Sequence, residues 1–95
     1  MNNIIQLEFD KATTRLAGNP YGRIVYDEQV ETKVNFDCLN VIIFPNHIEK
    51  IASSFVQGFF AKIIEKVGYG DFDKVVEIKA ANEQLINNIK NDLLV

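Results

Sequence analysis

"LNVIIFPNHIEKIASSFVQGFFAKIIEKVGYGDFDKVVEIKA", residues 39–80, contains the clearest structural patterns of this chain. It opens with a continuous apolar run over residues 39–44, which Pro45 stops and which is typical of a central strand covered on both faces. Residues 53–67 follow with helical periodicity, and residues 74–80 predict another strand. A strand, a helix and a strand in this order predict a right-handed parallel crossover.

The helix expected over residues 53–67 carries a broad apolar stripe. The stripe consists of Phe55, Val56, Phe59, Phe60, Ile63, Ile64 and Val67. Gly68 and Gly70 are expected to end this helix, because glycine is favoured just after a helix C-terminus. A second amphipathic helix is predicted over 82–94, with Asn82 as its N-cap. Its inward-facing residues are predicted to be Leu85, Ile86, Ile89 and Leu93.

The residues before this unit predict more strands. Residues 4–9 alternate between apolar and polar side chains, which is typical of a half-buried strand. Two glycines, an asparagine and a proline predict a turn or loop over 17–22. A strand over 23–28 and an alternating strand over 30–36 are expected next, paired as a hairpin. A short helix over 28–36 is the alternative for that segment.

Together these elements predict a single α/β domain spanning residues 1–95. We expect a small mixed β-sheet of four to five strands with two main helices packed on it. The chain has 95 residues, of which 47% are apolar and 24% are charged, so it has the composition of an ordinary globular protein.

Charge and cysteine content bound the function. A formal net charge of -3 argues against binding to nucleic acid and to anionic membranes. The single Cys38 excludes an intrachain disulfide and fits a reducing compartment. Neither a signal peptide nor an apolar run approaching the roughly 20 residues of a membrane span is visible. We therefore expect a cytoplasmic protein.

Candidate catalytic groups are few. His47 is the only histidine, and it is expected at the carboxyl end of the central strand, where ligands bind in open sheets. A hydrolase would pair it with Ser53 or Ser54 and orient it with Asp71 or Asp73. The chain lacks the Gly-x-Ser-x-Gly nucleophile motif, and it has too few histidines and cysteines for a metal site. The sequence thus predicts no enzyme activity, no metal and no cofactor.

Two motifs link the chain to a known family. They are "ASSFVQGFF" at residues 52–60 and "NPYGRIVYD" at residues 19–27, which contains the pair Gly22-Arg23. With the strands and helices around them, they make the chain resemble the bacterial STAS-like domain family, whose function is unknown. The resemblance covers about residues 4 to 92. The family carries a helix between its Gly-Arg strand and its central strand, whereas the residues of this chain predict a strand there.

The resemblance implies a regulatory function. The broader STAS fold includes anti-sigma-factor antagonists, which bind a histidine-kinase-like ATPase and are phosphorylated on a serine at a helix N-terminus. Ser54 matches that serine and Ser53 lies beside it, but Ala52 and Phe55 replace the antagonists' flanking Asp and Gly. A phosphate at a helix N-terminus is electrostatically favoured. The alternative role for Ser53 or Ser54 is to cap the helix, which is worth about 1 kcal/mol.

Three further features suggest contact surfaces. Phe60 and Tyr69 lie toward the margin of the apolar stripe, so one of them is expected to be exposed at an interface with another protein or with a second copy. Arg23 is expected to pair with an acidic residue of a neighbouring strand, or else with a partner's carboxylate. Asn46 and His47 belong to the loop over 45–52, which we expect to contact the partner.

The sequence therefore predicts a non-enzymatic, regulatory module that binds another protein, with a histidine-kinase-like ATPase as the partner that the resemblance implies. The alternative is a phage or mobile-element inhibitor that masks the surface of a host protein. A third hypothesis is a sensor of a small molecule or nucleotide that uses the same loop, residues 45–52.

Overall fold

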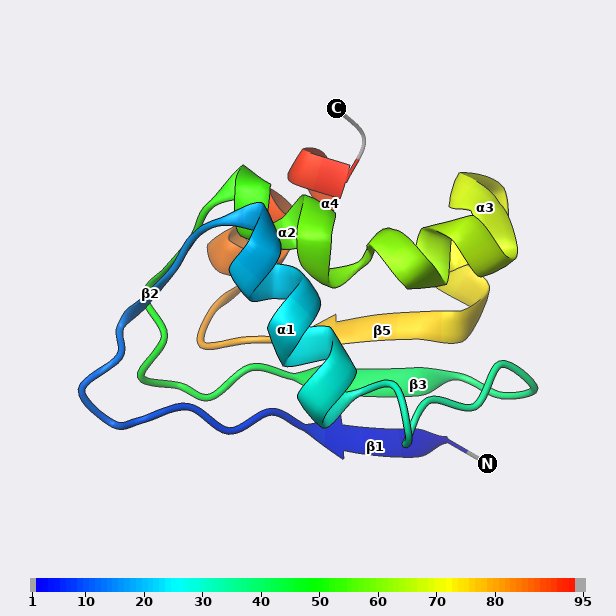
Figure 1. The fold of residues 1–95 in the computed structure, drawn as a ribbon, viewed down its shortest axis with the longest axis horizontal. Helices are drawn as coiled ribbons and strands as arrows, with labels where there is room; N and C mark the ends of the chain where they lie inside the picture. The colour runs from blue at the N-terminus through cyan, green and yellow to red at the C-terminus, as the bar shows by residue number, and fades with distance from the viewer. Residues whose placement is uncertain (1, 94–95) are drawn as a thin grey trace.

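The structure of this chain is a computed structural model, and it describes residues 2–93. Within these residues the chain forms an α/β fold with five short strands and four helices (Figure 1). The strands are β1 (Asn3–Gln6), β2 (Arg15–Leu16), β3 (Asn40–Ile43), β4 (Lys50–Ile51) and β5 (Val76–Lys79). The helices are α1 (Asn19–Gln29), α2 (Ser53–Phe59), α3 (Ala61–Val75) and α4 (Glu83–Leu93).

The strands form two small parallel sheets. The first has the order β1-β3-β5, with Ile5, Ile42 and Ile78 in register across it. The second pairs β2 with β4. The expected crossover over residues 39–80 is confirmed as parallel, with β3 as the central strand. The expectation of a mixed sheet is wrong for the described residues, because every strand pair in them is parallel.

The helices cover one face of the three-stranded sheet. Ile5, Ile42 and Ile78 point from the sheet into the hydrophobic core. On the other face Ile4 is 59% exposed and Glu77 is exposed. Val41 lies between these two in register and is buried, since its neighbours in β1 and β5 flank it. The apolar run of β3 therefore indicates a central strand whose side chains are buried on both faces, whereas the neighbouring strands expose side chains on the face away from the helices.

The segment predicted as a turn followed by a strand is helix α1. Pro20 lies in its first turn, where the missing backbone N–H costs no hydrogen bond. Gly18 precedes the helix at a φ of 98°, a conformation that favours glycine. Gly22, Val25 and Tyr26 are the buried residues, and their spacing of three and four is helical. The prediction of a strand over 23–28 is wrong, because the residues that face the core recur at helical spacing and not at every second position.

Residues 30–36 consist of turns and irregular backbone, so the predicted strand over 30–36 is wrong. The alternative helix over 28–36 is wrong beyond residue 29, where α1 ends. The buried side chain of Asn40 organises this connection. Its Oδ1 accepts hydrogen bonds from Asn3 Nδ2 at 2.8 Å and from the backbone N–H of Asn35 at 2.9 Å. Its Nδ2 donates to the carbonyl of Val75 at 2.9 Å. These hydrogen bonds connect the turns to the starts of β1, β3 and β5. The alternation of apolar and polar residues along the chain does not reveal such contacts.

The helix predicted over residues 53–67 is divided. Phe60, with φ -94° and ψ 1°, separates α2 from α3. Gly68, with φ 79° and ψ 164°, interrupts α3 in a region of backbone space that is essentially restricted to glycine. The predicted helix end at Gly68 is thus a sharp change of direction, after which helical turns resume as far as Val75.

Helices α1 and α2 cross at two glycines. A Cβ on Gly58 would overlap with the carbonyl oxygen of Asn19, and one on Gly22 would overlap with the carbonyl oxygen of Phe55. The backbones therefore approach more closely than any side chain would permit. The pair Gly22-Arg23 thus has a structural reason for its glycine, which is a helix-helix contact.

Helix α4 agrees with its prediction. The Oδ1 of Asn82 accepts a hydrogen bond from the backbone N–H of Leu85 at 2.9 Å, which confirms Asn82 as the N-cap. Leu85, Ile89 and Leu93 are buried and Ile86 is partly buried. Leu94, the last residue of the predicted helix, lies outside the described residues. Among residues 2–93, no helix combines the length and the apolar character needed to cross a membrane.

Candidate functional site: the surface around Tyr69

The sequence-predicted site residues lie in several places. Arg23 and Tyr69, which are far apart in the sequence, line one hollow between α1, α2, α3 and α4. Asn46 and His47 lie in the turn after β3, and Ser53 and Ser54 form the start of α2. Phe60 lies in the core.

Tyr69 is the exposed member of the aromatic pair that the sequence singled out. Its side chain is 61% exposed, whereas Phe60 is 0% exposed. The ring of Phe60 packs edge-on against Phe59 at 4.8 Å and against Phe72 at 5.4 Å between ring centroids. Because α3 continues past Gly68, Phe72 returns to the core beside Phe60. The prediction of Phe60 as a partner-binding residue is therefore wrong.

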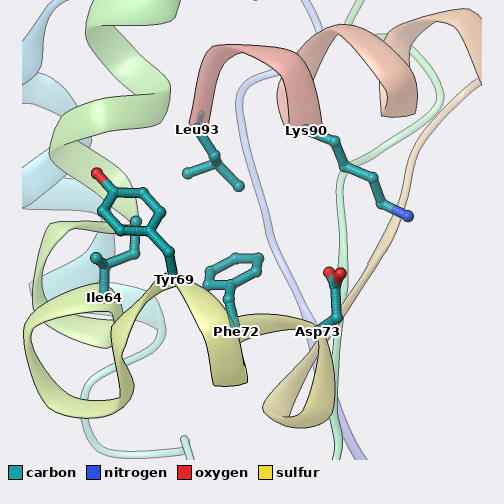
Figure 2. Close-up of a pocket in the computed structure, with 6 residues that line it drawn as sticks. All are labelled: Ile64, Tyr69, Phe72, Asp73, Lys90 and Leu93. Carbon is teal, nitrogen blue, oxygen red and sulfur yellow. The ribbon is translucent and has the colours of Figure 1, made fainter. Parts of the chain in front are cut away.

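Two hollows flank Tyr69. The first, of about 190 Å³, lies between α3 and the last turns of α4. Its lining residues are Ile64, Tyr69, Phe72, Asp73, Lys90 and Leu93. Figure 2 shows Tyr69, Phe72 and Asp73 rising from α3, with Lys90 and Leu93 on the facing wall. The second hollow, of about 270 Å³, shares Ile64, Tyr69 and Leu93 and extends to Arg23, Gln57, Ala61 and Glu65. Tyr69 thus stands between two depressions of one continuous surface.

This surface has an apolar centre and a charged rim. Phe72 and Leu93 are each 6% exposed, so they form the floor. Each hollow has one basic and one acidic side chain, Lys90 with Asp73 in the first and Arg23 with Glu65 in the second. An apolar centre with a polar rim is the usual anatomy of a protein-binding patch.

Arg23 belongs to this rim and not to a strand. Its Nε donates a hydrogen bond to Oδ1 of Asn19, one turn earlier in α1, at 2.9 Å. The expectation of a carboxylate partner on a neighbouring strand is wrong, since residue 23 lies in a helix. Sequence reasoning did not find Lys90 and Leu93 as site residues, because only the packing of α4 against α3 brings them there.

The two serines do not cap α2. Ala52 occupies the N-cap position, and no side chain there makes a capping hydrogen bond. The hydroxyl of Ser54 instead accepts a hydrogen bond from the backbone N–H of Gly18 at 3.0 Å, and Ser53 is exposed. Ser54 therefore joins the start of α2 to the start of α1.

His47 has a backbone partner. Its Nε2 lies 3.1 Å from the carbonyl oxygen of Asp10, while Asn46 beside it is exposed. This contact places the imidazole against the loop after β1. Within residues 2–93, no group of three or more His, Cys, Asp and Glu side chains is arranged to hold a metal ion.

A charged cluster joins α3 to α1 next to the second hollow. The ammonium of Lys62 lies 2.7 Å from Oδ1 of Asp27 and 3.3 Å from Oε2 of Glu31. The hydrogen bond from Lys62 lowers the pKa of Asp27, and the bonds to Asp27 and Glu31 raise the pKa of Lys62. Burial raises the pKa of Tyr26, over whose ring Lys62 also lies. The cluster links α3 to the end of α1, two of the helices that border the surface around Tyr69.

Comparisons with protein-family models, with curated proteins and with solved structures find no match to this chain.

Proposed function

We propose that this chain is a non-enzymatic regulatory module that binds another protein through the surface around Tyr69. The observation that carries the proposal is the 61% exposed ring of Tyr69 between two hollows. Tyrosine is enriched among the residues that dominate binding energy, since it offers a large apolar area and a polar tip at a low entropic cost. The backbone at Gly68 supports the proposal because it holds this ring outside the core.

The charges of the surface indicate the kind of partner. Arg23, Glu65, Asp73 and Lys90 mix both signs around an apolar centre. Such a rim suits the mixed-charge surface of a folded protein, and it offers no run of cations to a nucleic-acid backbone.

The partner class that the STAS-like resemblance implies is a histidine-kinase-like ATPase. In such a pair Ser54 would be the phosphorylated residue. Phosphorylation there would replace the hydroxyl that accepts the N–H of Gly18 by a dianionic phosphate between the starts of α1 and α2. Its oxygens could accept hydrogen bonds from N–H groups at both helix starts, so phosphorylation would change how these two helices meet.

The test uses site-specific photo-crosslinking in cells that express the chain. A benzophenone amino acid is placed at position 69 and, as a control, at position 4 on the opposite face of the sheet, where Ile4 is 59% exposed. We expect one dominant protein to be crosslinked from position 69, and we expect that protein not to be crosslinked from position 4. A crosslink to a second copy of the chain would identify a homodimer as the binding state.

Affinity for the crosslinked protein is then measured with purified variants. Tyr69→Ser should weaken binding about tenfold or more, as expected for a central contact, and Arg23→Gln should weaken it less because Arg23 lies at the rim. Ile4→Thr should leave it unchanged. Equal binding by the double variant Tyr69→Ser/Arg23→Gln and the wild-type chain would refute the proposal. Intact mass after incubation with the partner and ATP tests phosphorylation separately, with Ser54→Ala as the control.

A further inference from the structure

A third hollow lies on a different part of the molecule, at the carboxyl ends of the parallel strands. It has a volume of about 440 Å³, which falls within the range of small-molecule sites. Figure 1 shows β2 and the neighbouring segments beyond the arrowheads of the three-stranded sheet. Ligands of open parallel α/β sheets bind in this position, outside the carboxyl ends of the strands.

The hollow combines an apolar floor with a polar rim. Leu16, Ile51 and Leu85 line it but are only 1%, 7% and 5% exposed, so their side chains belong to the core and offer a ligand little surface. Ala17 and Ala52 also line it and are exposed, and because side chains alternate along a strand they lie on the same side as Arg15 and Lys50, two residues earlier. The rim carries two cations, Arg15 and Lys50, with the carboxylate of Glu49 and the amide of Asn88.

The two cations are placed side by side. Arg15 and Lys50 are register partners in the parallel pair β2-β4, and both are exposed. Like charges on directly opposed strand residues repel one another, which makes this placement unfavourable without a counter-charge. None of the ion pairs in residues 2–93 involves Arg15 or Lys50. Two adjacent cations without a carboxylate partner form a suitable cradle for a dianion, because each can donate charge-assisted hydrogen bonds to it.

We propose that this hollow binds a small phosphomonoester whose phosphate lies between Arg15 and Lys50 and whose apolar body lies over Ala17 and Ala52. The amide of Asn88 can donate a hydrogen bond to the phosphate or to a polar group of the body. Glu49 accepts a hydrogen bond from a hydroxyl or amino group of the ligand. This site is separate from the surface around Tyr69 and shares no lining residue with it.

The test follows backbone amide chemical shifts of the ¹⁵N-labelled chain during titration with phenyl phosphate. We expect saturable shifts concentrated at residues 15–17, 49–52, 85 and 88. Inorganic phosphate, which lacks the body, and benzyl alcohol, which lacks the charge, should each bind at least about tenfold more weakly. Benzoate should bind more weakly than phenyl phosphate because it carries a single negative charge.

Variants assign the binding to the two cations. Arg15→Gln/Lys50→Gln should weaken phenyl phosphate binding about tenfold or more, since each removed cation takes charge-assisted bonds with it. The matched control Lys66→Gln/Lys74→Gln removes the same charge from α3 and should leave the affinity unchanged. Retained affinity in the first variant, or an equal loss in the control, would overturn the proposal. So would shifts scattered over the surface, or equal affinity for phenyl phosphate and for any of the three comparison compounds.

Discussion

The contact between α1 and α2 and the surface between α3 and α4 are opposite uses of glycine. Gly22 and Gly58 let the first pair of helices touch backbone to backbone, so no space is left between them. Gly68 and Gly70 have open space around them, and the turn at Gly68 holds Tyr69 out of the core beside two hollows. The first region stabilises the fold, whereas the second keeps an aromatic side chain accessible. The two regions differ because Gly22 and Gly58 lie against the backbone of another helix, whereas Gly68 and Gly70 do not.

The sharpest test of this comparison sets Phe60 against Tyr69. Phe60→Ala should destabilise the fold by about 4 kcal/mol, because it empties a fully buried ring site. Tyr69→Ala should change the free energy of unfolding by no more than about 0.5 kcal/mol, as expected for an exposed side chain. Urea denaturation followed by circular dichroism measures both. Similar losses for the two variants would mean that Tyr69 belongs to the core and not to an accessible surface.

Next in size is the effect of a methyl group at Gly58. Gly58→Ala should cost about 3 kcal/mol, because the added Cβ would overlap with the backbone of Asn19 and force the helices apart. Gly70→Ala is the matched control: it lies in helical backbone with nothing within 4 Å and should be neutral, or stabilising by up to about 1 kcal/mol. Thermal and urea denaturation of the two variants distinguish them. A neutral Gly58→Ala would show that α1 and α2 do not cross this closely.

Gly68→Ala probes the turn that presents Tyr69. The cost should be about 2 kcal/mol, since the backbone there lies in a region that an L side chain rarely adopts. The relief of strain should also move Tyr69, so crosslinking from position 69 should fall in this variant. Full crosslinking together with unchanged stability would contradict the role assigned to Gly68.

The next prediction concerns the hydrogen bond between Ser54, at the start of α2, and Gly18, at the start of α1. Ser54→Ala should cost about 1 kcal/mol, because it leaves the N–H of Gly18 without its acceptor. Ser53→Ala, next to it and exposed, should be neutral within about 0.5 kcal/mol. Should Ser53→Ala prove the more costly of the two, the hydrogen bond to Gly18 would not be the reason for a serine in this motif.

The smallest effect is expected from the ion pair between Lys62 and Asp27, whose side chains are 43% and 49% exposed. The lowered pKa of Asp27 means that its contribution is present above about pH 4 and is lost as the pH falls through the folded-state value. The raised pKa of Lys62 means that its contribution is present at neutral pH and is lost in strong alkali. Lys62→Met should therefore lower the melting temperature slightly near pH 7 and not at pH 2. An equal difference at both pH values would assign the effect to packing.

Local sequence patterns predicted those elements whose apolar residues follow one regular pattern. The apolar run of β3, the stripe of α4 and its cap at Asn82 needed no distant partner to be found. Helix α1 could not be found this way, because glycine, proline and asparagine near its start are also turn residues. Tyr69 and Arg23 were each predicted as contact residues from the sequence, but the hollow that they share could not be predicted.

An α/β fold with a parallel crossover could be predicted from the amino-acid sequence, since periodicity and strand length depend on neighbours in the chain. Tertiary packing determines that Phe60 is buried while Tyr69 is exposed, because Gly68 redirects α3 between them. It also decided that Ser54 binds Gly18 and that Arg15 stands beside Lys50. These pairs are separated by tens of residues, and their contacts follow from how helices and strands pack, which no local pattern encodes.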